Sequence, residues 1–214
     1  ILVGLAVEGL WIAFHSPRLA VRQVEVVGAD QLGAARAQRL AGIPLGGNIF
    51  CLNLYRARVR VESDPLVASA EVSRALPNTV RILVQERHTV FVVSHAGQFY
   101  QLDGEGVLFR RVPRPTPNIP VLALSNVGPV GLGQRLRPEV MNPALACLHQ
   151  SIEDRLLPWK INIDGPHELC LNIRVPSRSH PPFQSLSVRL GRSEDLALKL
   201  ADVRKVLAGR PQVV

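Results

Sequence analysis

The chain has 214 residues, 47% of them hydrophobic, which is enough for one or two domains with packed cores. Its 17 prolines and 16 glycines imply many turns, which favours a strand-rich or mixed fold over a helical bundle. The formal net charge is +8, but the 25 Lys and Arg residues are spread along the chain and form no basic run interleaved with aromatic residues. We therefore expect no nucleic-acid binding, and instead a basic surface that is solvated or faces lipid.

The cysteines do not form a recognisable framework. Cys51, Cys147 and Cys170 are widely spaced and include no CxxC pair, which argues against a disulfide framework or a zinc site. Cys147 lies two residues before His149, but the apolar stretch ALACLHQSI around them favours a buried thiol and a surface histidine over metal ligands. We expect neither a metal nor a cofactor.

The first 14 residues are apolar apart from Glu8 and two glycines. As a helix with a rise of about 1.5 Å per residue they would reach about 21 Å, short of the roughly 30 Å hydrocarbon core of a bilayer. They could be the outer part of a membrane span that begins before this sequence, with Trp11, His15 and Arg18 where the helix leaves the lipid. The alternative is a strand or helix of a soluble core.

A strand and a helix are expected next. Period-two alternation in VRQVEVV predicts a strand over residues 21–27. Asp30 is a suitable N-cap for a helix that begins at Gln31 and ends at Gly42.

The stretch GIPLGGNIFCLNL, residues 42–54, could cradle a phosphate or form a hinge between two packed elements. A phosphate loop of the Walker type needs a Lys and a Ser or Thr and follows a strand, whereas this stretch has none of these residues and follows the expected helix. We therefore predict a hinge, in which Gly46 and Gly47 reverse the chain and Ile49 and Phe50 enter the core.

A second helix is expected over residues 52–61, and Leu52, Tyr55 and Val59 lie along one side, which Glu62 extends. Two strands follow, over 67–76 and 79–86, separated by a turn at Pro77. In the second of these strands one face is formed by Val80, Ile82 and Val84. The unit therefore has the order strand, helix, helix, strand, strand.

The second half begins with a hairpin in QFYQLDGEGVLFRR, residues 98–111. Asp103 and Glu105 could be paired carboxylates for acid–base chemistry, but their place in a glycine-flanked turn favours exposed turn residues. Residues 112–120, VPRPTPNIP, are expected to be an extended connector.

Two further helices and three strands complete the expected fold. The first helix has Asn142 as its N-cap, Pro143 at its first position and an apolar face of Leu145, Leu148, Ile152 and Leu156. The strands are expected over 159–163, 168–175 and 184–190. The last helix, over 194–208, is capped by Ser193, and its apolar face consists of Leu196, Leu200, Val203 and Leu207.

Several of these stretches resemble the FtsQ/DivIB family of bacterial cell-division proteins, which contains a POTRA domain. The similar segments, in chain order, are VRQVEVVG, GIPLGGNIFCLNL, VESDPLVASAEVSRALPNTVRILVQER, QLDGEGVLF, WKINID and VRLGRSEDLALKL. The order Leu-Pro-Asn-Thr followed by Glu86-Arg87 is the most specific part. His88 departs from the family, in which proline is usual at this place.

The resemblance implies an α+β fold: a POTRA domain (β-α-α-β-β) followed by a mixed, mainly antiparallel β domain with two helices. The expected divisions are a membrane-anchor remnant and juxtamembrane segment over 1–20, the POTRA domain over 21–90 and the β domain over 91–214. The family has a further strand after the last helix, which we expect to lie outside this sequence.

The resemblance also implies a function without catalysis. It describes a single-pass inner-membrane scaffold, with both domains on the periplasmic or extracytoplasmic side, that recruits and links other division proteins at the septum. FtsB-like and FtsL-like partners bind the C-terminal part of the β domain, and no nucleic acid or small-molecule substrate is expected.

Addition of a partner strand to a sheet edge is a physical route to such binding. The first candidate is the strand 184–190, with Leu186, Val188 and Leu190 on one face and Ser185, Ser187 and Arg189 on the other. The second candidate is the strand after the second helix, which carries Val72 and Arg74. The alternative is that both strands are only structural.

Two other function classes remain open. A POTRA-bearing assembly or transport factor of the outer membrane usually has several POTRA repeats or a long barrel, whereas this chain shows one unit. A small hydrolase would need a nucleophile, a base and an orienting group, but the six histidines lie in unrelated contexts and no GxSxG occurs.

Overall fold

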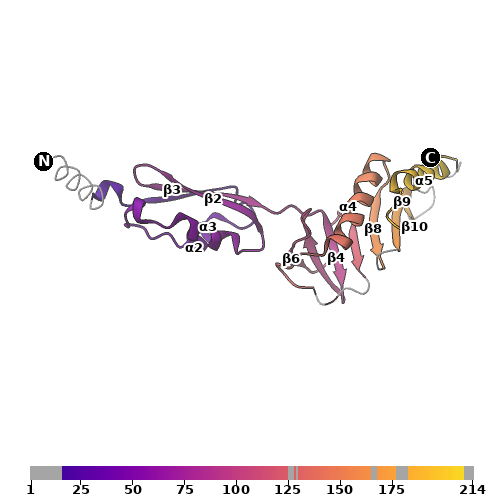
Figure 1. Ribbon diagram of the computed structural model, residues 1–214, viewed down its shortest axis with the longest axis horizontal. Coiled ribbons are helices and arrows are strands. Elements are labelled where there is room, and N and C mark those ends of the chain that lie inside the picture. The colour runs from indigo at the N-terminus through magenta and orange to yellow at the C-terminus, as the bar shows by residue number, and fades with distance from the viewer. Residues whose placement is uncertain (1–15, 125–127, 129, 165–167, 177–182, 210–214) are drawn as a thin grey trace. The chain divides into compact units, whose positions relative to one another are not determined.

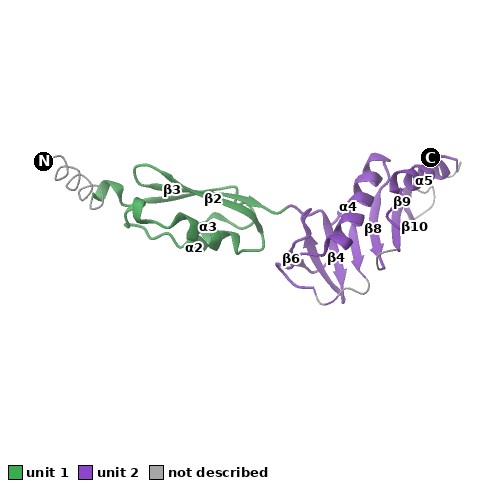
Figure 2. Ribbon diagram, viewed as in Figure 1, with its two compact units in different colours: residues 1–87 green, residues 88–214 purple. Residues whose placement is uncertain are grey.

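A computed structural model of the chain describes residues 16–124, 128, 130–164, 168–176 and 183–209. The chain forms two compact units, residues 1–87 and 88–214 (Figure 2). The expected membrane anchor over residues 1–14 lies outside the described residues. Within the described part of the chain, no helix combines the length and apolar character needed to cross a bilayer.

Unit 1 is a three-stranded sheet with two helices on one face (Figure 1). Its sheet has the order β1-β3-β2, in which β1 and β3 are parallel and β2 and β3 are antiparallel. Its elements, in chain order, are η1 (Pro17–Leu19), β1 (Gln23–Val27), α2 (Ala34–Ala41), η2 (Ile49–Cys51), α3 (Leu54–Glu62), β2 (Val67–Ala75) and β3 (Thr79–Glu86). This is the predicted order of a POTRA domain.

The core of unit 1 lies between the helices and β3, and the predicted face of β3 is confirmed, because Val80, Ile82 and Val84 are buried. The predicted face of α3 is wrong. Tyr55 is 69% exposed, whereas Ala57 and Val61 are buried. Small side chains let a helix approach the sheet closely, so the side of α3 with the smaller residues packs inward.

The start of α2 also differs from the prediction. The helix begins at Ala34, after a turn, and Asp30 does not cap it. The amides of Gln31 and Leu32 instead donate to the buried carboxylate of Glu86, at 2.7–3.0 Å. The acceptor is more than 50 residues away in the chain, so a local pattern could not identify it.

The glycine stretch is a chain reversal, as predicted. Gly46 has a φ of 83°, a left-handed conformation that favours glycine. Its amide donates to the carbonyl of Val21 at 2.8 Å, and the amide of Val21 donates to the carbonyl of Gly47 at 2.9 Å. Ile49 is fully buried as expected, but Phe50 is 47% exposed, so only one of the two predicted side chains enters the core.

Unit 2 is a seven-stranded mixed sheet in the order β10-β9-β8-β7-β4-β5-β6, packed against α4 (Figure 1). Only the β8–β7 and β7–β4 pairs are parallel, so the predicted mainly antiparallel β domain is confirmed. Its elements are β4 (Phe91–His95), β5 (Gln98–Leu102), β6 (Leu108–Val112), β7 (Val121–Leu124), α4 (Pro138–Glu153), β8 (Pro158–Ile163), β9 (Leu169–Pro176), β10 (Phe183–Gly191) and α5 (Leu196–Ala208).

The strands β4 and β7 were not predicted from the sequence, and the predicted starts of α4 and α5 are wrong. Pro138, rather than Pro143, is the proline in the first turn of α4, and Arg137 is the N-cap. The buried residues of α4 are Met141, Ala144, Cys147 and Ser151, whereas Ile152 is 62% exposed. In α5 the predicted apolar face is confirmed, but the N-cap is Asp195 in a left-handed conformation rather than Ser193.

The hairpin turn of unit 2 is formed as predicted, but Asp103 is buried rather than exposed. Its carboxylate accepts the amide of Glu105 at 3.0 Å and that of Val107 at 2.7 Å. Glu105 is exposed and forms an ion pair with Arg135 at 3.0 Å. The two carboxylates therefore have structural roles in the turn.

Candidate partner-binding surfaces

Each sheet has two edge strands, and their backbone groups determine where a partner strand could add. The edge at β1 is guarded, because the side chain of Gln38 donates to the carbonyl of Val24 at 2.7 Å. The edge at β6 is partly covered, because the amide and carbonyl of Leu108 bond to Gln134 and Gly133. The remaining edge strands are β2 and β10.

The direction of the peptide groups in β10 follows from its neighbours. The amide of Arg174 in β9 donates to Leu157 on the β8 side of the sheet. Neighbouring residues of a strand point their peptide groups to opposite sides, so Ile173 points to β10, where it pairs with Leu186. The next residues of β10 alternate, and the peptide groups that point out of the sheet edge are those of Ser185, Ser187 and Arg189.

The side chains of β10 alternate as predicted, but the apolar ones face the protein. Leu190 is buried, and Leu186 and Val188 are partly buried against the core of unit 2. On the other face, Ser185 accepts the indole N–H of Trp159 at 3.0 Å, and Arg189 is exposed. Of the four residues that our sequence analysis selected in this strand, Arg189 alone has an exposed side chain.

Ser185 and Ser187 were not among the predicted partner-binding residues, although their peptide groups point outward. Side-chain character carries no signal for the direction of a peptide group. The direction depends on pairing with β9, which the tertiary structure sets.

The β2 edge of unit 1 is partly occupied. The amide of Ala70 donates to the side chain of Glu62 at 3.1 Å, so Ala70 points out of the sheet edge and, by alternation, so do Val72 and Arg74. The guanidinium of Arg74 donates to the carbonyls of Ile49 at 2.8 Å and Leu52 at 3.0 Å. The side chain of Arg74 therefore holds the chain that precedes α3, and only its backbone faces outward.

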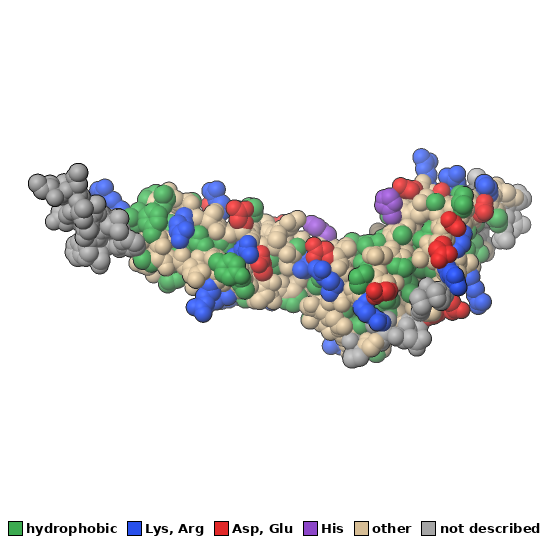
Figure 3. Space-filling view, in the orientation of Figure 1, with side chains coloured by type: hydrophobic (Ala, Val, Ile, Leu, Met, Phe, Trp, Pro, Cys, Tyr) green, Lys and Arg blue, Asp and Glu red, His purple; other side chains and the backbone are tan. Residues whose placement is uncertain are grey.

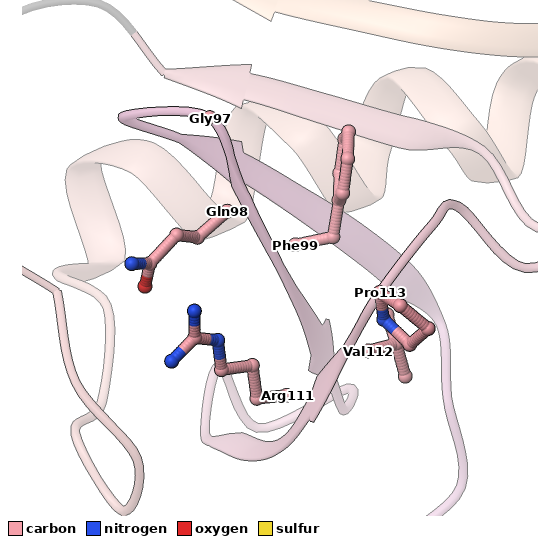
Figure 4. A pocket seen from close by; sticks show the side chains of 6 residues that line it. All are labelled: Gly97, Gln98, Phe99, Arg111, Val112 and Pro113. Carbon is pink, nitrogen blue, oxygen red and sulfur yellow. The ribbon is translucent and has the colours of Figure 1, made fainter.

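Two hollows lie on the surfaces of the units. One, of about 320 Å³, lies at the end of β5 and β6, where the side chains of Gln98 and Arg111 lie on the same side (Figure 4). The other, of about 560 Å³, lies between β1 and α2 and includes Arg22 and Arg39. The cations in both suit anionic groups, and neither lining contains a carboxylate, histidine or cysteine for acid–base or nucleophilic work.

The thiols are in different environments. Cys147 is fully buried, and burial raises the pKa of its thiol to about 11, so at neutral pH it is protonated and a poor nucleophile. The predicted surface position of His149 is confirmed, because its side chain is 78% exposed. No group of three His, Cys, Asp or Glu side chains placed to hold a metal occurs among the described residues.

The comparisons with known proteins agree with the fold. Residues 19–87 match the family model described as "POTRA domain, FtsQ-type". The chain is 33% identical to the cell division protein FtsQ of Rhodothermus marinus over 95% of this chain and 72% of that protein. It is 25% identical to the cell division protein DivIB of Clostridium acetobutylicum over 89% of this chain and 74% of that protein.

A third relative, the cell division protein FtsQ of Streptomyces bingchenggensis, is 34% identical, over 52% of this chain and 43% of that protein. The POTRA match covers unit 1, and the two longer alignments extend over most of unit 2 as well. The chain belongs to the FtsQ/DivIB family of bacterial cell-division proteins.

Proposed function

We propose that this protein is a non-enzymatic scaffold of the division machinery, anchored in the inner membrane by a single N-terminal span, that recruits and links other division proteins. Its POTRA and β domains lie on the extracytoplasmic side. The relatives' names support a role in division. The FtsQ-type POTRA match favours this role over outer-membrane assembly or transport.

The observation that carries the proposal is the edge strand β10. Eight of its nine residues pair with β9 on one side, and on the other side its outward peptide groups present donors and acceptors to an added strand. The leucines and valine of β10 pack against the core, so the edge is held in place before a partner arrives. An FtsB-like or FtsL-like segment adds here as an extended strand, and Arg189 favours a partner with an acidic side chain opposite it.

The β2 edge is a second and smaller site of the same kind. Its outward groups at Val72 and Arg74 are open to an extended segment, while Glu62 guards the neighbouring position. The guanidinium of Arg74 is bonded inside unit 1 and the side chain of Val72 packs against its core, so binding here rests on the backbone groups.

The test is a proline in β10. Ser187→Pro removes one outward N–H and leaves the ladder with β9 intact, whereas Ser187→Ala removes only the hydroxyl. We expect Ser187→Pro in the full chain to weaken binding of an FtsB/FtsL-like complex about tenfold or more, and Ser187→Ala to bind like the parent protein. Val72→Pro tests the β2 edge in the same assay.

Hydrogen exchange of the β9 amides checks that the Ser187→Pro variant keeps its sheet. Equal binding by the proline and alanine variants, with β9 still protected, would exclude strand addition at β10. A substrate turned over by the purified protein would exclude the non-enzymatic scaffold.

A further inference from the structure

Three segments of unit 1 meet at one end of its sheet. The bridge between Ala20 and Asn48 joins the start of the described chain to the glycine reversal. The amide of Arg22 donates to the carbonyl of Asn78 at 2.8 Å, which joins it to the β2–β3 turn. Figure 1 shows this turn at the end of unit 1 where the described chain begins. We call this end of unit 1, formed by residues 16–22, 44–53 and 75–79, the tip.

The tip exposes large apolar side chains. Leu45 is 66% exposed, Leu76 is 62% exposed and Phe50 is 47% exposed, one from the glycine reversal, one from the β2–β3 turn and one from η2. Three such side chains on adjacent loops are more than the scattered single leucines of an ordinary protein surface. The contacts between the loops bring them to one place.

The charged side chains of the tip are all positive. The three segments of the tip contain no Asp or Glu, and the whole stretch from residue 31 to residue 61 contains none either. The exposed cations are Arg18 and Arg22 at the tip, with Arg56 in the first turn of α3 beside it. Figure 3 shows hydrophobic and basic side chains side by side at this end of unit 1.

We infer that the tip of the POTRA unit docks onto an anionic lipid surface. Leu45, Leu76 and Phe50 enter the headgroup boundary, and the arginines bind lipid phosphates. The inference rests on the proposed membrane attachment, because the apolar residues 1–14 precede the tip directly and would hold it within reach of the bilayer. Docking would fix the POTRA unit against the membrane rather than leave it on a free tether.

A bilayer suits the tip better than a protein partner does. An anionic membrane takes up apolar side chains and binds arginines at the same time, and its surface needs no complementary shape. This suits side chains that come from separate loops. The backbone of the tip is already bonded within unit 1, through Val21, Gly46 and Arg22. An added strand of the kind proposed for β10 would therefore find few backbone donors and acceptors to bind at the tip.

Cys51 provides a native probe position, because it is exposed and adjoins Phe50 in η2. The full chain with Cys170→Ser, in which the buried Cys147 stays unmodified, would carry an environment-sensitive fluorophore at Cys51. The chain is then reconstituted in phosphatidylcholine vesicles with or without phosphatidylglycerol, and quenching by lipids with a nitroxide at the headgroup is measured.

A matched probe is placed at residue 69 of β2 by Ser69→Cys with Cys51→Ser. It lies about 20 Å from the tip along the strand, at a rise of about 3.3 Å per residue. We expect strong quenching at Cys51 and little at Ser69, and stronger quenching at Cys51 with phosphatidylglycerol. Arg18→Gln with Arg22→Gln should weaken docking to vesicles with phosphatidylglycerol about fivefold for each arginine, and so reduce the dependence on phosphatidylglycerol.

The apolar contribution is tested by Leu45→Ser with Leu76→Ser, which should weaken docking about tenfold or more. The matched control, Leu83→Ser with Leu132→Ser, changes two leucines that are about half exposed and belong to none of the three segments of the tip. Near-ultraviolet circular dichroism checks that all variants are folded.

Equal quenching at Cys51 and Ser69, or no effect of the tip substitutions, would overturn lipid docking, as would quenching that needs an added division protein. The proposed partner binding at β10 would survive each of these results, because no partner protein is needed in the vesicles. A chain that does not float with the vesicles at all would overturn both lipid docking and the proposed membrane attachment.

Discussion

The buried carboxylate of Glu86 closes the turn before α2, and its removal should destabilise unit 1. The side chain accepts the amide of Gln31 at 2.9 and 3.0 Å and that of Leu32 at 2.7 Å. These donors lie in the turn between β1 and α2, more than 50 residues earlier in the chain. Glu86 therefore joins the last strand of the POTRA unit to the entry of its first helix.

The magnitude follows from the chemistry of these bonds. Hydrogen bonds to a charged group contribute about 1.5–3 kcal/mol each, and a buried donor without a partner costs about 1–3 kcal/mol. Glu86→Gln keeps one oxygen but turns an amide NH₂ towards backbone N–H groups. We expect it to lower the free energy of unfolding by about 2–3 kcal/mol, and Glu86→Ala by about 3–4 kcal/mol. In a domain of this size, the smaller change lowers Tm by about 10–20 °C.

The measurement has to separate the units, because each has its own core. Hydrogen exchange of the α2 amides in the full chain reports unit 1, and the amides of β8 and β9 report unit 2. The matched control is Glu25→Gln, which removes an exposed ion pair with Arg81 and should cost at most about 1 kcal/mol. The reasoning fails if both glutamine variants lose equal stability, or if α2 keeps its full protection without Glu86.

The remaining predictions concern one backbone contact and one thiol. Gly28 has a φ of 80°, and an added Cβ would lie 2.2 Å from the carbonyl oxygen of Val84, so Gly28→Ala should cost about 2–4 kcal/mol in urea unfolding. Gly46→Ala, at a similar φ but with open space around it, should cost about 1 kcal/mol, and equal losses would contradict the contact. At pH 8 a thiol reagent should modify Cys51 quickly and the buried Cys147 only after unfolding. The raised pKa of Cys147 gives stability that is full below about pH 9 and is lost as the pH rises through about 11, so Cys147→Ala should flatten this part of the pH profile.

The strands with a clear period of two could be predicted from the sequence, and those without it could not. The strand Thr79–Glu86 alternates strictly, and its buried face is the one predicted. The strand β4 is buried at three consecutive positions, Phe91, Val92 and Val93, because it lies inside the seven-stranded sheet. A short strand at such a place shows no alternation, so its pattern carries no period to detect.

The two candidate binding edges were predicted as strands from the sequence, but the groups that each edge presents to a partner were not. Val72 and Arg74 were selected because their strand could be a sheet edge, and the structure shows that the guanidinium of Arg74 binds the backbone of Ile49 and Leu52. In β10 the apolar residues face the core, and the outward groups are peptide groups. Which edge is guarded depends on side chains from other elements, such as Gln38 and Glu62.

The sequence by itself determined the order of elements in unit 1, the glycine reversal, the hairpin and the family, because each depends on residues close together in the chain. Only the tertiary structure decided which face of α3 is buried, what caps the turn before α2 and which strands end each sheet. It also brought Leu45, Phe50 and Leu76 to one tip. These features are set by contacts between residues tens of positions apart, and such contacts leave no local period in the sequence.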